Sequence, residues 1–145
     1  MINEKKFLFT EVMIVDDDEL DHASCMRAFK KINFAEKAIS FKTAEAALSL
    51  FTHPTSRLPE LLLMDVNIPR INGLELIERA STKLRQQNVV VALLLSCPLP
   101  RDLHNRAAEN PDIAAFINKP VQSQALLSLA QNVWDKRRQS VSETL

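Results

Sequence analysis

The chain has 145 residues, of which 46% are apolar and 25% charged, a composition typical of one soluble globular domain. Its 18 basic and 18 acidic residues cancel to a formal net charge of zero, which argues against a general attraction to nucleic acid or to an anionic membrane. No long apolar run or secretory leader stands near the start. We therefore expect a cytoplasmic protein that is neither exported nor membrane-spanning.

Short apolar runs alternate with amphipathic segments along the whole chain. The expected strands are residues 12–15, 37–41, 61–64, 89–95 and 113–117. The expected helices are residues 19–33, 44–51 with Thr43 as the N-cap, 74–84, 101–109 and 126–134. Because the strands are continuously apolar rather than alternating, they predict a parallel sheet covered by helices on both faces. The fold class is therefore α/β, built from five βα units.

Polar residues follow four of the five predicted strands. The first strand is followed by the acidic residues Asp16, Asp17, Asp18, Glu19 and Asp21. The third strand is followed by Asp65, the fourth by Ser96 and the fifth by Lys119. Each of these residues taken alone is more easily explained as a helix cap, a turn or a solvated charge. In a parallel α/β sheet, however, ligands bind beyond the carboxyl ends of the strands, so together these residues predict a site there.

The chemistry of these residues suits phosphoryl transfer. Neighbouring carboxylates repel one another unless a cation lies between them, and Mg²⁺ held by Asp16 or Asp17 together with Asp65 would satisfy them. The Asp65 carboxylate could then attack a phosphoryl group and form an acyl phosphate. Lys119 would supply a second positive charge, and the Ser96 hydroxyl would donate to a phosphoryl oxygen.

Across residues 11–134 the chain resembles the receiver domain of two-component response regulators, in particular the single-domain, chemotaxis-type receivers. The matching segments are Ile14-Val15-Asp16-Asp17-Asp18, Leu62-Leu63-Met64-Asp65-Val66-Asn67-Ile68-Pro69, Gly73, Leu95-Ser96 and Lys119-Pro120. The resemblance implies a flavodoxin-like (βα)5 fold with strand order 2-1-3-4-5. We expect an N-terminal extension over residues 1–10, the receiver domain over 11–138 and a polar tail over 139–145.

The resemblance also implies a role for each acidic site residue. Asp65 would be the phosphoacceptor, and its phosphoryl group would come from a sensor histidine kinase or a histidine phosphotransfer protein. Asp16 and Asp17 match the acidic pair that binds Mg²⁺ together with Asp65. The backbone carbonyl of Asn67 would complete the ligands that the protein supplies to the metal.

A switch and an output surface follow from the same resemblance. Ser96 and Lys119 would contact the phosphoryl group, and Phe116 would move into the space vacated when Ser96 is drawn inward. The Lys119–Pro120 bond is expected to be cis. Since about ten residues follow the last predicted helix, we expect output through the receiver itself or by onward phosphotransfer. Its partner would be a downstream protein at the face of the fourth helix, fifth strand and fifth helix, with the chain a monomer or weak dimer.

Several further residues are given no functional role. Asp18 is interpreted as a charge at a helix start, where it suits the helix dipole, and His22 as a solvated helix position. His53 and His104 lie in polar surroundings that point to no function. The two cysteines, Cys25 and Cys97, form no CxxC motif and are expected to be buried free thiols.

Two residues beside Ser96 depart from the family pattern. Cys97 is larger than the small residue common there, and Pro98 has no side-chain group that could orient an attacking water molecule. We therefore hypothesise that phosphorylated Asp65 loses its phosphate slowly.

Two other functions remain open at this point. A phosphatase of the haloacid dehalogenase type also uses a strand-end Asp, a Lys and magnesium, and Asp16-x-Asp18 has the spacing of its first motif. Leu20, however, stands where that motif has Thr or Val, and no late acidic pair follows Lys119. A receiver-like binding module that is never phosphorylated is the second alternative, and the complete set of site residues argues against it. We expect no enzymatic activity beyond the chain's own phosphorylation and dephosphorylation.

Overall fold

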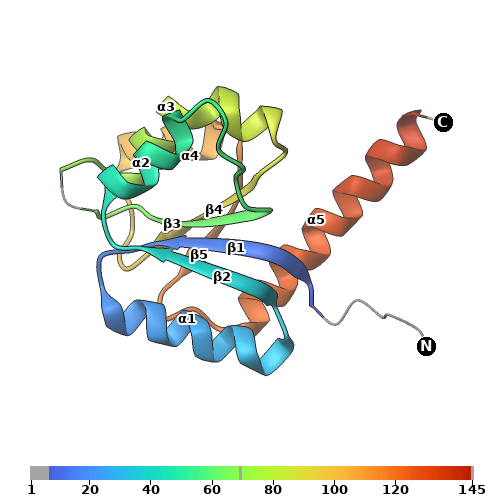
Figure 1. Cartoon of the computed structure of the whole chain (residues 1–145), viewed down its shortest axis with the longest axis horizontal. Coiled ribbons are helices and arrows are strands. Elements are labelled where there is room, and N and C mark those ends of the chain that lie inside the picture. Colours follow the sequence, from blue (N-terminus) through green and yellow to red (C-terminus); the bar gives the residue numbers. More distant parts are fainter. Residues whose placement is uncertain (1–6, 69, 145) are drawn as a thin grey trace.

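The computed structural model describes residues 7–68 and 70–144, and side chains as far as residue 137. A five-stranded parallel sheet forms the centre, with helices on both faces (Figure 1). The strand order is β2-β1-β3-β4-β5. The predicted α/β, flavodoxin-like fold and its strand order are therefore confirmed.

The chain forms five consecutive βα units. The strands are β1 (Phe9–Val15), β2 (Ala35–Phe41), β3 (Leu61–Asp65), β4 (Val90–Leu95) and β5 (Ile113–Asn118). The helices are α1 (Glu19–Ile32), α2 (Ala44–Thr52), α3 (Gly73–Gln86), α4 (Arg101–Glu109) and α5 (Ser123–Thr144). Every expected element is present. Thr43 caps α2 as expected, since its side chain accepts a hydrogen bond from the Ala46 amide.

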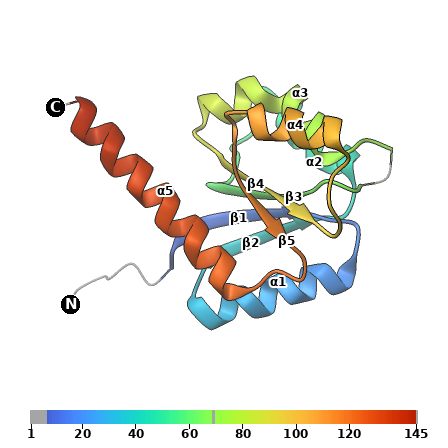
Figure 2. The same ribbon diagram turned by 180° about the vertical axis from the view of Figure 1, so that it is seen from behind.

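Three elements, β1, β2 and α5, are clearly longer than their apolar patterns indicate. β1 and β2 pair from Phe9 and Ala35 onward, ahead of the apolar runs, because backbone pairing does not require apolar side chains. The α5 helix continues to Thr144 and so includes residues 139–144, which the polar sequence had assigned to a tail. Figures 1 and 2 show the C-terminal part of α5 extending beyond the sheet. Among the residues that the structure describes, no helix is long and apolar enough to cross a membrane.

The helices divide into two layers because alternate residues of each strand point to opposite faces. In β3, Leu61 and Leu63 join the core beneath α1 and α5, whereas Leu62 and Met64 join the core beneath α2, α3 and α4. Figure 2 shows α1 and α5 together on one side of the sheet. Burial on both faces explains why the strands are continuously apolar in the sequence.

The register of the strands brings their carboxyl ends to one edge of the sheet. Val15 of β1 pairs with Met64 of β3, and Asp65 pairs with Leu94 of β4. Leu95 in turn pairs with Asn118 of β5. The residues that follow β1, β3, β4 and β5 are consequently neighbours at that edge.

Candidate functional site

The acidic residues after β1 are held by a tight turn into α1. Asp16 is buried, and its amide donates to the Phe41 carbonyl, which extends the pairing of β1 with β2. Its Oδ1 accepts a hydrogen bond of 3.0 Å from the Asp18 amide. Asp18 caps α1 through a 2.8 Å hydrogen bond from the Leu20 amide, so its interpretation as a helix-start charge is confirmed. Asp17, between them, is exposed.

The Lys119 ammonium lies at the centre of the site. Its Nζ is 2.7 Å from Asp16 Oδ2, 2.7 Å from Asp21 Oδ2 and 2.9 Å from Asp65 Oδ2. Only 9% of the Lys119 side chain is exposed. Its backbone amide donates to the Leu95 carbonyl, and this bond fixes the loop after β5 against the end of β4. One buried cation therefore contacts three carboxylates.

Burial and this contact shift the pKa values of two residues. Burial raises the pKa of Asp16 to about 6, and the nearby charge of Asp65 adds to the increase, while Lys119 opposes it. Burial alone would lower the pKa of Lys119, but its contacts with the carboxylates of Asp16, Asp21 and Asp65 raise it above its ordinary value. Lys119 is thus a permanent positive charge, and an excess of negative charge remains beside it.

Three carboxylates, which we call the carboxylate triad, are arranged as a cation site would require. Oxygens of Asp16, Asp17 and Asp65 all lie within 4.8 Å of one another. Asp16 Oδ2 is buried and accepts no well-directed hydrogen bond, since its contact with Lys119 is an ion pair without that geometry. Mg²⁺ prefers carboxylate oxygens. The residues therefore fit the metal that the resemblance implies.

The chain matches the response regulator receiver domain over residues 12–131. It belongs to the response regulator receiver family. A curated relative, the probable methanogenesis regulatory protein FilR2 of Methanothrix harundinacea, is 22% identical over 125 residues, which cover 84% of this chain and 79% of FilR2.

Solved structures of response regulators share the fold of this receiver. A two-component response regulator from Cytophaga hutchinsonii has a TM-score of 0.74 and 26% identity, over 88% of this chain and 98% of that one. Another from Legionella pneumophila has a TM-score of 0.67 and 26% identity, over 83% of this chain and 94% of that one.

The remaining predicted site residues of the receiver lie around the triad and Lys119. The exposed Asn67 donates its amide to Asp65 Oδ1 at 3.0 Å, which orients that carboxylate. Ser96 is exposed, directly after β4. The Lys119–Pro120 bond is cis, the isomer that the resemblance implies.

The Cys97 thiol is exposed, so the expectation that both cysteines are buried is wrong for this one. Cys97 lies two residues beyond the end of β4, in the segment before α4, where Ser96 and Pro98 are exposed as well. Cys25, on α1, is buried as expected, and burial raises the pKa of its thiol to about 12.

Phe116 points outward from the edge strand β5. Its side chain is 43% exposed, and its ring stacks on that of His104 from α4, with ring centroids 6.5 Å apart. His104 thus lies on a helix and contacts a predicted switch residue. The sequence offered no signal for this pairing, because it depends on how α4 packs beside β5.

His22 is buried, and its interpretation as a solvated helix position is therefore wrong. Its Nε2 lies 2.6 Å from the backbone carbonyl oxygen of Asp16. Since a carbonyl only accepts hydrogen bonds, Nε2 carries the proton and donates it. His22 shares the buried face of α1 with Cys25 and Phe29, three and seven residues later, so helical spacing was the available signal.

Asp21 is the site residue that sequence reasoning missed. It was grouped with the acidic residues after β1 but given no separate role. The structure brings its carboxylate to Lys119, which is 98 residues away in the chain. The first turn of α1 supplies this contact, and no periodicity in the sequence predicts which acidic residue makes it.

The only glycine of the receiver lies where α3 begins against β3. The Gly73 amide donates to the Val66 carbonyl at 2.8 Å. A Cβ at Gly73 would lie 2.2 Å from the backbone oxygen of Asp65, a separation that real Cβ atoms do not show. Gly73 therefore allows α3 to pack directly on the backbone of the predicted phosphoacceptor.

Proposed function

We propose that this receiver accepts a phosphoryl group on Asp65 from a phosphohistidine of a sensor histidine kinase or histidine phosphotransfer protein. The observation that carries the proposal is the position of Asp65 Oδ2, which lies 2.9 Å from the buried Lys119 ammonium and belongs to the carboxylate triad. A carboxylate nucleophile, a fixed cation and ligands for a divalent metal are the components that phosphoryl transfer requires.

The transfer itself needs little from the protein beyond positioning and charge neutralisation. An Asp65 carboxylate oxygen attacks phosphorus, the bond from phosphorus to the imidazole nitrogen breaks, and its electron pair remains on the imidazole. Lys119 and the Ser96 hydroxyl hold phosphoryl oxygens. Asp16, Asp17, Asp65 and the Asn67 carbonyl would hold Mg²⁺, which supplies neutralisation of charge on the phosphoryl oxygens.

We further propose that the receiver signals through the face of α4, β5 and α5. On this face the Phe116 side chain of β5 is 43% exposed, and its ring stacks on that of His104 from α4. When Ser96 is drawn toward the phosphoryl group, Phe116 turns inward and changes the surface that a downstream protein binds. In this proposal the receiver is a monomer or weak dimer and catalyses only its own phosphorylation and dephosphorylation.

Incubation with acetyl phosphate and Mg²⁺, followed by mass spectrometry, tests the chemistry. We expect one phosphoryl group on Asp65, none on the Asp65→Asn variant, and none in the presence of EDTA. A phosphoryl group that survives Asp65→Asn would refute the proposal. If Asp16 proved to bear the group, the phosphatase reading would replace it.

A further inference from the structure

We infer that Asp21 is a positioning residue, which holds the Lys119 ammonium in the place where phosphoryl transfer to Asp65 needs it. The inference rests on the proposed function and adds a residue outside the carboxylate triad. Asp21 Oδ2 lies 2.7 Å from Lys119 Nζ and makes a hydrogen bond with it. This separation is as short as that between Lys119 and Asp16, and shorter than that between Lys119 and Asp65.

Unlike the other two carboxylate partners of Lys119, Asp21 has no proposed role in binding the metal or accepting the phosphoryl group. Asp16 and Asp65 belong to the carboxylate triad, whereas Asp21 does not. A metal would engage the triad, and phosphorylation would convert one oxygen of Asp65 into the bridging oxygen of an acyl phosphate. Asp21 is then the one carboxylate partner of Lys119 that the reaction leaves unchanged.

The element that carries Asp21 is well anchored beside the site. Asp21 lies in the first turn of α1, which Asp18 caps. The next residue, His22, ties the same turn to the Asp16 backbone through its 2.6 Å contact. A lysine side chain loses considerable rotamer freedom when its ammonium is fixed. Because Asp21 holds the ammonium in place in the unphosphorylated receiver, that entropy is already lost before the phosphoryl donor binds.

Asp21 also has an opposite effect, because its negative charge reduces the attraction of Lys119 for phosphoryl oxygens. The Asp21 side chain is 28% exposed, so water screens this charge in part. The hydrogen bond at 2.7 Å, by contrast, directs a lysine side chain that is only 9% exposed. Positioning should therefore outweigh the loss of charge, and removing Asp21 should slow phosphorylation rather than speed it.

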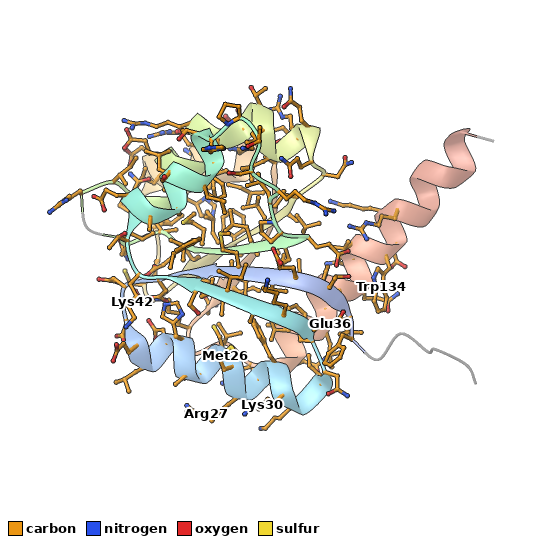
Figure 3. All side chains as sticks on the ribbon, viewed as in Figure 1. Met26, Arg27, Lys30, Glu36, Lys42 and Trp134 are labelled. Atoms are coloured by element: carbon orange, nitrogen blue, oxygen red, sulfur yellow. The ribbon has the colours of Figure 1, made fainter. Side chains whose placement is uncertain are left out.

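The test compares phosphorylation rates of three variants over a range of acetyl phosphate concentrations with Mg²⁺. Asp21→Ala removes the contact, and Asp21→Asn keeps an oxygen that accepts from Lys119. Glu19→Ala is the matched control, since it removes the same charge from the same turn of α1. Glu19 pairs with the exposed Lys42 instead, which Figure 3 shows at the end of the molecule where α1 begins.

We expect Asp21→Ala to lower the limiting rate about five- to tenfold, the effect of losing one of several hydrogen bonds to a charged group. The half-saturating acetyl phosphate concentration should change less than about twofold, because Lys119 keeps its charge and still attracts the dianion. Asp21→Asn should recover most of the rate, and Glu19→Ala should match the unmodified receiver. Mg²⁺ affinity should hardly change in any of them.

The outcomes separate this inference from the function on which it rests. If the unmodified receiver is labelled on Asp65 and Asp21→Ala is equally fast, the inference is overturned and the proposed function stands. Equal slowing by Asp21→Ala and Glu19→Ala would overturn it too, since only the charge of the turn would then matter. If the unmodified receiver takes no label, the proposed function fails and the inference with it. Thermal melting verifies folding, and Asp21→Ser, too short to reach Lys119, repeats the test should alanine not fold.

Discussion

Substitution of Gly73 by alanine should disturb both stability and chemistry, because the added Cβ meets the end of β3. It would lie 2.2 Å from the Asp65 backbone oxygen, 3.0 Å from the Asp65 carbonyl carbon and 2.7 Å from Met64 Cγ. Met64 is fully buried and has little room to move. The Asp65 carbonyl can move only with the backbone that carries the predicted phosphoacceptor.

The expected cost follows from opposing contributions. Alanine is ordinarily better than glycine in a helix by about 0.5–1 kcal/mol. Overpacking a tight core costs about 1–3 kcal/mol, and a clash with backbone belongs at the upper end of that range. Weakening the bond from the Gly73 amide to the Val66 carbonyl adds about 1 kcal/mol. The net loss of unfolding free energy is about 2–3 kcal/mol, equivalent to a fall in Tm of about 8–12 °C for a chain of roughly this size.

Chemical and thermal unfolding followed by circular dichroism, in EDTA, measures this loss. Asn72→Ala is the control, since Asn72 caps α3 by accepting from the Glu75 amide at 2.7 Å and its removal causes no clash. That variant should lose about 1 kcal/mol. A shift of the Asp65 backbone should also slow phosphorylation of Gly73→Ala far more than that of Asn72→Ala. If Gly73→Ala proved no less stable than Asn72→Ala, the reasoning from the close approach would be wrong.

Three further predictions concern metal binding, stability and phosphate lifetime. Since the pKa of Asp16 is raised to about 6, protons should compete with Mg²⁺ for this carboxylate below that pH. Titration calorimetry should therefore show the Mg²⁺ affinity falling as the pH decreases through about 6, and changing little between pH 7 and 8. His22→Phe should lower the unfolding free energy in urea by about 1–2 kcal/mol, because the buried Asp16 carbonyl loses its donor; an unchanged midpoint would contradict that contact. Phosphorylated Asp65 should persist for minutes or longer. The Pro98→Asn variant, whose side chain can orient an attacking water molecule, should lose its phosphate faster. Decay of the unmodified phosphoprotein within seconds would refute the hypothesis of slow dephosphorylation.

The sequence predicted the sheet and the strand-end residues because both depend on local patterns. Continuous apolar runs identify buried parallel strands, and residues that follow such strands must meet at one edge of the sheet. Asp16 and Lys119 directly follow β1 and β5, and Asp65 is the last residue of β3. The proximity of these three residues therefore required no knowledge of side-chain packing.

Contacts made by helix side chains were not predictable in the same way. Asp21 meets Lys119 only because α1 crosses beside the loop after β5, and the sequence does not give that crossing. His22 was open to prediction, because it shares helical spacing with the buried residues of α1. Cys97 was misjudged because its neighbours are apolar, whereas burial depends on where β4 ends.

The charges at the site indicate why phosphoryl transfer should depend on a divalent cation. Asp16, Asp17, Asp21 and Asp65 carry up to four negative charges around the single ammonium of Lys119. Phosphorylation replaces the one charge of Asp65 with about two, so the excess grows in a site where burial weakens screening by water. Lys119 is already shared among three carboxylates and cannot offset the addition alone. We therefore expect Lys119 to be insufficient by itself, and phosphorylation of Asp65 to need the added positive charge of a divalent cation.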